Sequence, residues 1–231
     1  MSRKLIKYNT IKGELTCVTG LRIGGSAENI EIGGMENPII RHPLNDEPYI
    51  PGSSIKGKVR SLLEYQYQRR DNQGQTKGEN GRDNGEPCEC GRCMICRVFG
   101  PHKNTKHNQG PTRVLFRDAA LTKESKKELL EAQPSKGIFF AEVKTENLVN
   151  RNTGTAEHPR TQERVPAGMR FDFEISIRIF DDDRETEIMD LLKQGLTMLQ
   201  ADYLGGSGSR GYGKISLDYK ISEAKIEKQA G

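Results

Sequence analysis

The sequence predicts an α+β fold with an antiparallel sheet, in the order strand, helix, strand, strand, helix, strand. Two observations carry this prediction. Residues 171 to 179 alternate apolar and polar side chains, the period of two that is typical of a half-buried strand. Residues 188 to 199 instead repeat leucine and isoleucine at the spacing of one helix face.

The first half of the chain supplies the first three elements. Residues 4 to 19 are rich in β-branched side chains, which favours a strand. The sequence Pro51-Gly52-Ser53-Ser54 then stops the chain and opens a helix, with Ser53 or Ser54 available as the N-cap. A short second strand is predicted from 113 to 117. The apolar residues that recur at helical spacing in this first helix are Ile55, Val59, Leu62 and Leu63.

The second half supplies the remaining three elements. The alternating strand at 171 to 179 is followed by the amphipathic helix at 188 to 199, and residues 214 to 221 alternate again as the last strand. This order is that of the ferredoxin-like (RRM-like) βαββαβ core, in which both helices cover one face of the sheet.

Two long polar stretches interrupt this core. We interpret 71 to 112 and 141 to 168 as insertions, because both are polar and charged and few of their residues are apolar. Loops of this length are rarely ordered without something to hold them. The 231 residues therefore fit a single domain, 1 to 231, that carries two insertions, although two small domains are also compatible with the length.

Composition excludes several protein classes. No run approaches the roughly 18 apolar residues of a membrane span, and the N-terminus lacks the apolar core of a signal peptide. We therefore expect a cytoplasmic, soluble protein without a membrane partner. The net charge of +4 is only mildly basic, so binding to nucleic acid must depend on local clusters of charge.

Four of the five cysteines fall within nine residues, which predicts a metal centre. Four thiolates can close a tetrahedral zinc site, and a closed site of this kind is structural. A set of three cysteines with His102, His107 or His42 is the alternative. Cys17, in the first strand, is expected to be a small core residue. The candidate zinc ligands are Cys88, Cys90, Cys93 and Cys96.

Two clusters of glycine, serine and basic residues form a candidate surface for binding an RNA backbone. Glycines let a main chain approach a phosphate closely, and hydroxyl and cationic side chains donate to it. The first cluster opens a helix, whose N-terminal N–H groups favour an anion. Read as ordinary structure, the clusters are a capped helix and a flexible turn. The candidate residues are Ser53, Ser54, Lys56, Lys58 and Arg60 in the first cluster, and Gly205, Gly206, Ser207, Gly208, Ser209, Arg210, Tyr212 and Lys214 in the second.

Together, residues 20 to 60 and 203 to 214 closely resemble the RAMP-superfamily backbone subunit of type III-A (Csm) CRISPR complexes. Further similarity appears at 117 to 118, 141 to 144 and 159 to 165, and covers nearly the whole chain except 71 to 98. Type III-D relatives share these motifs. The resemblance adds Gly24, Gly25 and Ser26 to the candidate RNA-binding residues.

The resemblance implies a filament in which copies of the chain stack along one CRISPR RNA beside other type III effector subunits. A thumb-like hairpin, here residues 144 to 165, wedges between bases and kinks the duplex of guide and target RNA. An acidic residue in the first loop then cleaves the target RNA at each kink, with Mg²⁺ or Mn²⁺ required.

Glu36 occupies the catalytic position of this family pattern, where the family places aspartate. Its carboxylate can hold a metal or promote attack by the neighbouring 2′-hydroxyl. Glutamate reaches about 1.5 Å further than aspartate, so the alternative is a non-catalytic RNA-binding subunit. A third class is a metal-independent endonuclease that matures the guide, with His42 or His158 as its base.

Overall fold

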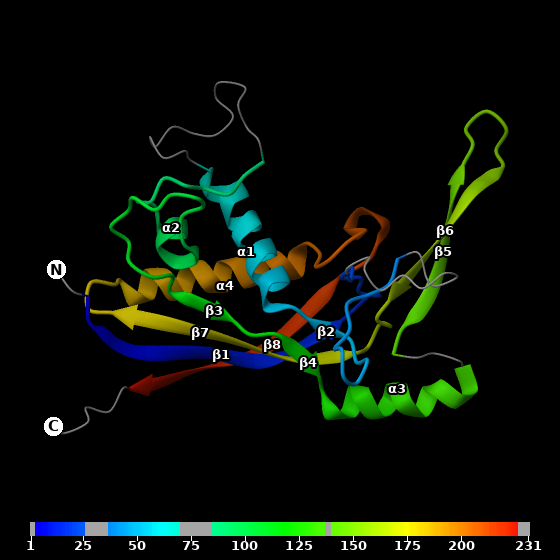
Figure 1. The fold of residues 1–231 in the computed structure, drawn as a ribbon, viewed down its shortest axis with the longest axis horizontal. Helices are drawn as coiled ribbons and strands as arrows, with labels where there is room; N and C mark the ends of the chain where they lie inside the picture. The colour runs from blue at the N-terminus through cyan, green and yellow to red at the C-terminus, as the bar shows by residue number, and fades with distance from the viewer. Residues whose placement is uncertain (1–2, 26–36, 70–84, 137–139, 226–231) are drawn as a thin grey trace.

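The computed structural model describes residues 3–25, 37–69, 85–136 and 140–225 (Figure 1). Its strands are β1 (Leu5–Cys17), β2 (Tyr49–Ile50), β3 (Val114–Phe116), β4 (Ala119–Leu121), β5 (Glu142–Val149), β6 (Ala156–Arg164), β7 (Arg170–Phe180) and β8 (Ile215–Lys225). Its helices are α1 (Gly52–Tyr67), α2 (Met94–Phe99), α3 (Lys123–Lys136) and α4 (Glu185–Ala201), with a short 3-10 turn at Gly208–Arg210.

The main sheet is antiparallel, as the sequence predicts. Its path runs β2-β4-β7-β1-β8, β3 also pairs with β7, and every pairing is antiparallel. The first, third and last strands of the predicted core are thus β1, β7 and β8, and β3 with β4 takes the place of the second. The ferredoxin-like order of elements is confirmed.

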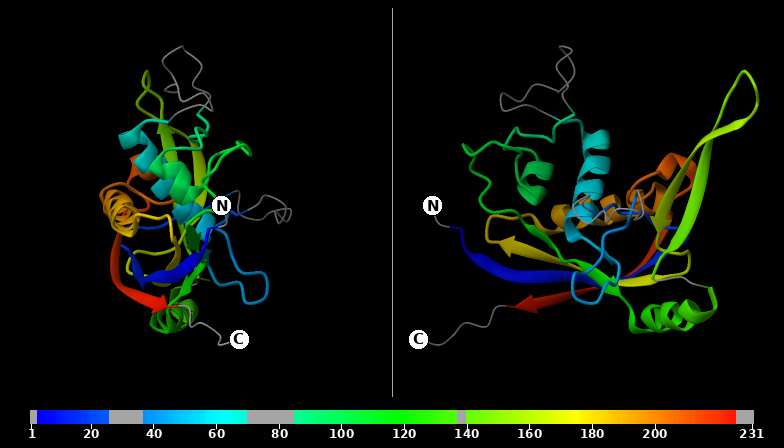
Figure 2. Two further views of the ribbon diagram at one scale, coloured as in Figure 1. Left: turned by 90° about the vertical axis from the view of Figure 1, so that its left-hand side faces the viewer. Right: turned by 45° about the vertical axis from the view of Figure 1, so that its right-hand side comes forward.

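Helices α1 and α4 lie on the same face of the sheet (Figures 1 and 2). The sheet side chains facing them, such as Ile11 and Ile175, are buried. The helices cross closely at Gly195, where a Cβ atom would lie only 2.7 Å from Val59 Cγ1. The opposite face of the sheet carries charged pairs such as Arg170 with Glu14. No helix among the described residues is long and apolar enough to cross a membrane.

The start of α1 differs from the prediction. Pro51 occupies the N-cap position, and neither Ser53 nor Ser54 caps the helix. The N–H of Gly52 instead donates to Asp118 Oδ1 at 2.7 Å. A carboxylate from the turn between β3 and β4 therefore caps the helix, so the predicted serine cap is wrong.

Helix α3 is the longest of the elements that the sequence pattern does not predict, which also include α2, β2 and β4. Of the side chains described in it, few are buried, so the periodic apolar signal is weak. The helix begins behind Thr122, whose Oγ1 accepts the N–H of Ser125 at 3.2 Å. This is the local bonding of a serine or threonine N-cap.

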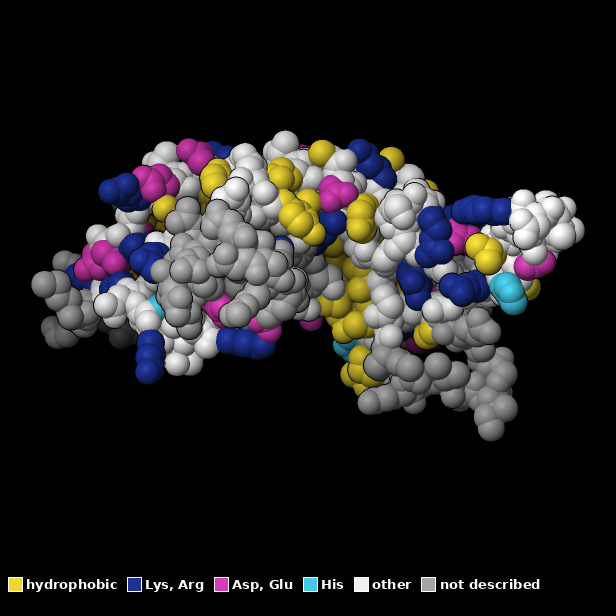
Figure 3. All heavy atoms as spheres, turned by 90° about the horizontal axis from the view of Figure 1, so that it is seen from above, with side chains coloured by type: hydrophobic (Ala, Val, Ile, Leu, Met, Phe, Trp, Pro, Cys, Tyr) yellow, Lys and Arg dark blue, Asp and Glu magenta, His cyan; other side chains and the backbone are white. Residues whose placement is uncertain are grey.

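Strands β5 and β6 form a two-stranded hairpin that projects from the body (Figures 1 and 2). It corresponds to the predicted thumb-like insertion, and we call it the thumb. Lys and Arg side chains gather around its base (Figure 3). Arg164 pairs with Glu142 across the hairpin at 2.5 Å, whereas Glu163 pairs with Arg41 outside it.

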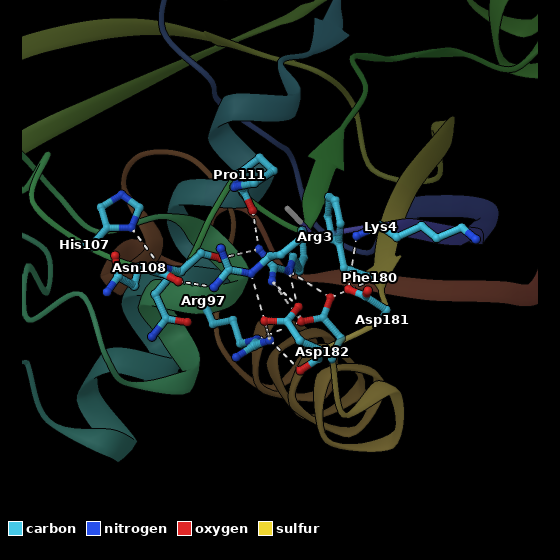
Figure 4. Close-up of polar contacts among 12 residues, drawn as sticks. Arg3, Lys4, Arg97, His107, Asn108, Pro111, Phe180, Asp181 and Asp182 are labelled. Carbon is cyan, nitrogen blue, oxygen red and sulfur yellow. Dashed lines mark hydrogen bonds and ion pairs between the residues drawn. The ribbon is translucent and has the colours of Figure 1, made fainter. Parts of the chain in front are cut away.

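A buried ionic network joins the cysteine-rich insertion to the turn between β7 and α4 (Figure 4). The side chains of Arg113 and Asp183 are both fully buried and lie 2.9 Å apart, and Arg97 of α2 reaches Asp183 at 2.7 Å. Burial alone would raise the pKa of Asp183, but hydrogen bonds from Arg113, the Phe180 N–H and Arg97 hold that pKa below its ordinary value. The carboxylate is therefore ionised at neutral pH.

Replacing Asp183 by asparagine is expected to lower the free energy of unfolding by about 3–5 kcal/mol, because the buried Arg113 guanidinium loses its nearest charged partner and keeps only Asp182, at 3.8 Å. Since the pKa of Asp183 is lowered by folding, this contribution is complete above the unfolded value of about 3.9 and is lost as pH falls further. Urea unfolding of both proteins at pH 7 and between pH 4 and pH 2 measures it. An equal loss on acidification in both proteins would contradict the assignment.

Candidate functional site

The four clustered cysteines lie in the geometry of a tetrahedral metal site. Their Sγ atoms all lie within 4.8 Å of one another, with Cys88 to Cys93 at 3.8 Å and Cys90 to Cys96 at 3.9 Å. A tetrahedron of sulfurs at 2.3 Å from zinc has edges of about 3.8 Å. These separations are far longer than a disulfide bond, and none of the four sulfurs is in a disulfide. The residues present fit a bound metal ion.

The local chain fixes the last three cysteines. Cys93 is the N-cap of α2, and its Sγ accepts the N–H of Cys96 at 3.4 Å. The Cys93 N–H in turn donates to Cys90 Sγ at 3.4 Å. Two consecutive Cys-x-x-Cys turns thus aim three sulfurs at one point, and both N–H groups stabilise a thiolate there.

Crowding also alters the acidity of the thiols when no metal is bound. The hydrogen bond with Cys88, ahead of burial, raises the pKa of Cys93 to about 12. The pKa of Cys96 is raised by hydrogen bonds with Cys88 and Cys93. Cys93 and Cys96 are therefore protonated near pH 7 when no metal is bound. Metal binding to them would release these protons.

The histidine alternatives have other contacts in the structure. His107 Nδ1 accepts the Gln109 N–H at 3.2 Å (Figure 4). His42 Nδ1 accepts the Leu44 N–H at 3.3 Å. His102 contacts the cysteine cluster through its main chain, whose N–H donates to the Cys88 carbonyl. Within the described part of the chain, the metal-binding group near these residues consists of cysteines alone. Cys17 is fully buried in the core, as expected.

The two glycine-rich segments, 20–25 and 203–214, meet directly, and we call them together the glycine cradle. The Gly206 N–H donates to the Arg22 carbonyl at 2.8 Å, and the Gly213 N–H donates to the Gly20 carbonyl at 3.0 Å. The fold therefore brings together two segments that lie near opposite ends of the chain.

Two of its glycines are required by this close approach. A Cβ atom on Gly205 would lie 2.2 Å from the Arg22 carbonyl oxygen, and one on Gly213 would lie 2.0 Å from the Leu204 carbonyl oxygen. Both residues also have positive φ angles, +78° and +71°. Contact of the chain with itself therefore explains these glycines, and the exposed side chains around them are the groups that remain for a ligand.

The base of the thumb contacts the glycine cradle. Ser207 Oγ lies 3.4 Å from Gln162 Oε1, and Arg210 Nη1 lies 3.3 Å from Glu146 Oε2. Tyr212 is buried beneath two thumb cations, Lys144 and Arg164, whose charged groups lie 4.6 and 4.9 Å from its ring centroid. Burial, and then the neighbouring Glu146, raise the pKa of Tyr212. Tyr212 is thus a packing residue under the cationic surface.

The basic residues of α1 divide between two sites. Lys58 Nζ lies 3.7 Å from the centroid of the Tyr203 ring and 2.9 Å from Asp202 Oδ2, so it joins α1 to the glycine cradle. Lys56 is half-buried, and burial lowers its pKa. Arg60 points to the cysteine cluster instead, where Nη2 donates to the Cys88 carbonyl at 2.9 Å.

Exposure separates the remaining predicted residues. Ser53, Gly24, Ser209, Arg210 and Lys214 are exposed, and Gly25, Ser54, Gly205, Gly206, Ser207 and Gly208 are partly buried. At the start of α1 the capping carboxylate of Asp118 already accepts the Gly52 N–H, so an anion there would meet a negative charge. The exposed cations of the site are therefore at the glycine cradle and the thumb.

Glu36 and Ser26 lie outside the described residues, but the segment resumes at Asn37. The Asn37 side chain accepts from Arg22 Nη2 at 3.1 Å, and its carbonyl accepts the Glu163 N–H at 3.2 Å. The chain immediately after Glu36 is thus bonded to both the glycine cradle and the thumb base. Local sequence patterns give no sign of Arg22, Gln162 or Glu146 as members of this site, because their partners are distant along the chain.

Comparison with known proteins gives a consistent result. The family model of the RAMP superfamily matches residues 14–216. The chain is 46% identical to the CRISPR system Cms endoribonuclease Csm3 of Methanothermobacter thermautotrophicus, an alignment covering 97% of this chain and 90% of that protein. It is 43% identical to the protein of the same name from Methanocaldococcus jannaschii, covering 91% and 79% of the two chains.

Two solved structures have similar folds. A chain of the Csm3-Csm4 subcomplex in the type III-A CRISPR-Cas interference complex superposes with a TM-score of 0.59 at 30% identity, covering 96% of this chain and 82% of that one. A chain of the type III-B Cmr-beta complex bound to cognate target RNA superposes with a TM-score of 0.57 at 22% identity, covering 95% and 61%. The second likeness concerns the fold alone.

Proposed function

We propose a function that follows from the family of this chain, which belongs to the RAMP superfamily and, within it, to the Csm3 endoribonucleases. The chain would bind guide RNA as a repeating subunit of a type III-A CRISPR complex and cleave bound target RNA. It would form one domain, with a zinc-binding insertion and the thumb. Its partners would be CRISPR RNA, complementary target RNA, copies of itself in a helical filament and other effector subunits.

The convergence of three distant segments at one place supports this proposal. Residues 20–25, the thumb base and residues 203–214 are hydrogen-bonded to one another. Phosphate contacts position a nucleic acid, and the exposed Arg210 and Lys214 at this junction offer donors for them. The Asn37 contacts bring the chain that follows Glu36 to the same junction.

The cysteine cluster would hold Zn²⁺ as a structural ion, since all four tetrahedral positions are taken by sulfur. Cleavage would use a separate Mg²⁺ or Mn²⁺, which when bound stabilises charge on a transferring phosphoryl group. Glu36 would be the catalytic carboxylate. The second candidate, a non-catalytic RNA-binding subunit, is favoured by the presence of glutamate in place of aspartate at this position.

If RNA contacts the glycine cradle, the exposed cations there should contribute to RNA affinity, and their contribution should depend on salt concentration. Replacing Arg210 and Lys214 together by alanine is expected to weaken guide-RNA binding by about tenfold or more, since hydrogen bonds to charged groups contribute roughly 1.5–3 kcal/mol each. The slope of log affinity against log salt should also fall by roughly 0.7 for each phosphate of single-stranded RNA that the variant no longer neutralises. Fluorescence anisotropy of labelled guide RNA at several salt concentrations measures both quantities.

Lys12 provides the matched control. It is an exposed cation on the opposite face of the sheet, and its weak 3.9 Å pairing with Glu174 makes its loss harmless to the fold. The Lys12→Ala protein should keep both the affinity and the salt slope of the unaltered chain. Equal effects of Lys12→Ala and the double substitution would show that only overall charge matters.

A further inference from the structure

Two side chains of α1 bond to the main chain of Cys88, one on each side of the residue. Glu64 Oε1 accepts the Cys88 N–H at 2.9 Å, and Arg60 Nη2 donates to the Cys88 carbonyl at 2.9 Å. The two side chains also bond to each other, with Arg60 Nε 2.7 Å from Glu64 Oε1. We call this arrangement the Cys88 clamp.

The clamp is largely shielded from solvent. Arg60 and Glu64 stand four residues apart on one face of α1, and their side chains are 13% and 4% exposed. A buried ion pair contributes little net stability, because the cost of desolvating both charges offsets their attraction. The main structural contribution of this ion pair is therefore its two hydrogen bonds to the main chain of Cys88.

Cys88 needs such external support more than the other cysteines. Cys90, Cys93 and Cys96 follow one another at two-residue gaps and are fixed by their own N–H···S bonds and by α2. Cys88 precedes Cys90 by a single intervening residue, so the repeating Cys-x-x-Cys turn does not extend to it. Its sulfur nevertheless lies 3.8 Å from that of Cys93, the tetrahedral edge length.

We propose that Arg60 and Glu64 are positioning residues of the metal centre, which hold Cys88 so that its sulfur completes the tetrahedron. This inference rests on the proposed zinc site. It reassigns Arg60, which the sequence places among the RNA-binding residues, to the metal. Residues that orient the ligands of a metal typically contribute 10-fold to 100-fold to its affinity.

The test replaces both side chains by leucine, Arg60→Leu with Glu64→Leu, and measures zinc affinity by competition with a chromogenic chelator. Apolar replacement of a whole buried ion pair usually preserves folding, so the variant isolates the missing bonds to Cys88. Zinc affinity is expected to fall by about 10-fold to 100-fold. The matched control is Lys127→Ala with Glu131→Ala, which removes an exposed pair of the same spacing on α3 and should leave zinc affinity unchanged.

Arg60→Lys is the milder second variant, which keeps the positive charge and the fold. A lysine cannot bond to both Glu64 and the Cys88 carbonyl in the same geometry, so a smaller loss of zinc affinity is expected. Unchanged zinc affinity in both variants, or loss of RNA affinity alone, would overturn the clamp and leave the zinc site standing. Failure of the unaltered chain to bind zinc would overturn the zinc site itself and the clamp with it.

Discussion

Replacing Glu36 by alanine is expected to lower the rate of target-RNA cleavage by about 10²–10⁴-fold, the usual contribution of a general acid or base. The assembled complex with guide RNA and a complementary RNA should then leave that RNA uncut. The affinity for guide RNA should stay the same, because the proposed phosphate contacts are made by the cations Arg210 and Lys214. Gel analysis of the fragments, which should be evenly spaced for the unaltered chain, measures the effect.

Two further variants serve as the control and the comparison for this experiment. Asp46→Ala removes a second, exposed carboxylate from the same part of the chain, 4.0 Å from Arg41, and should cut normally. Glu36→Asp shortens the side chain by about 1.5 Å. Cleavage that appears only with aspartate would establish the non-catalytic alternative, and equal cleavage by Glu36→Ala and the unaltered chain would show that Glu36 is not the catalyst.

The fold could be predicted because its signals are local. The alternation in β7 and β8 and the apolar stripe of α4 are set by neighbours within a few residues, and both strands and the helix form where these patterns lie. Helix α3 gave no such signal. The cap of α1 was predicted wrongly because its acceptor, Asp118, lies 66 residues away in the sequence.

In the candidate site, too, features set by residues close in sequence could be predicted, and contacts between residues far apart in sequence could not. The spacing of the cysteines predicted a group that could hold a metal, and their sulfurs do lie together. The contact between segments 20–25 and 203–214 joins residues far apart in the sequence. Arg60 was grouped with the RNA-binding residues because it is a cation in the first cluster, but the sequence does not show that it bonds to Cys88. Nor does the sequence reveal that Arg113 and Asp183 form a buried pair, since only the folded sheet brings them together.

Zinc removal is expected to loosen the cysteine-rich insertion first. The binding energy of structural zinc, roughly 10–16 kcal/mol in small finger peptides, is coupled to folding. In this chain Ile95, Val98 and Phe99 also join the main core, and Arg97 bonds to Asp183. Part of α2 is therefore supported from outside the metal site. Amide hydrogen exchange should consequently accelerate from residue 85 to 112, while β1 and β7 stay protected.

The variant that removes the zinc site replaces both Cys90 and Cys96 by serine. Its control is Cys17→Ala. With free zinc at about a thousand times the Kd, the metal contributes roughly 4 kcal/mol, so its loss should lower the Tm by roughly 8–16 °C in a chain of this size. Cys17 is equally buried but lies outside the cluster, so its replacement should lower stability by the same amount with and without zinc. The structural assignment would be wrong if the zinc-free chain kept its Tm and its exchange pattern but lost cleavage until zinc was restored. That result would show that the ion acts in catalysis.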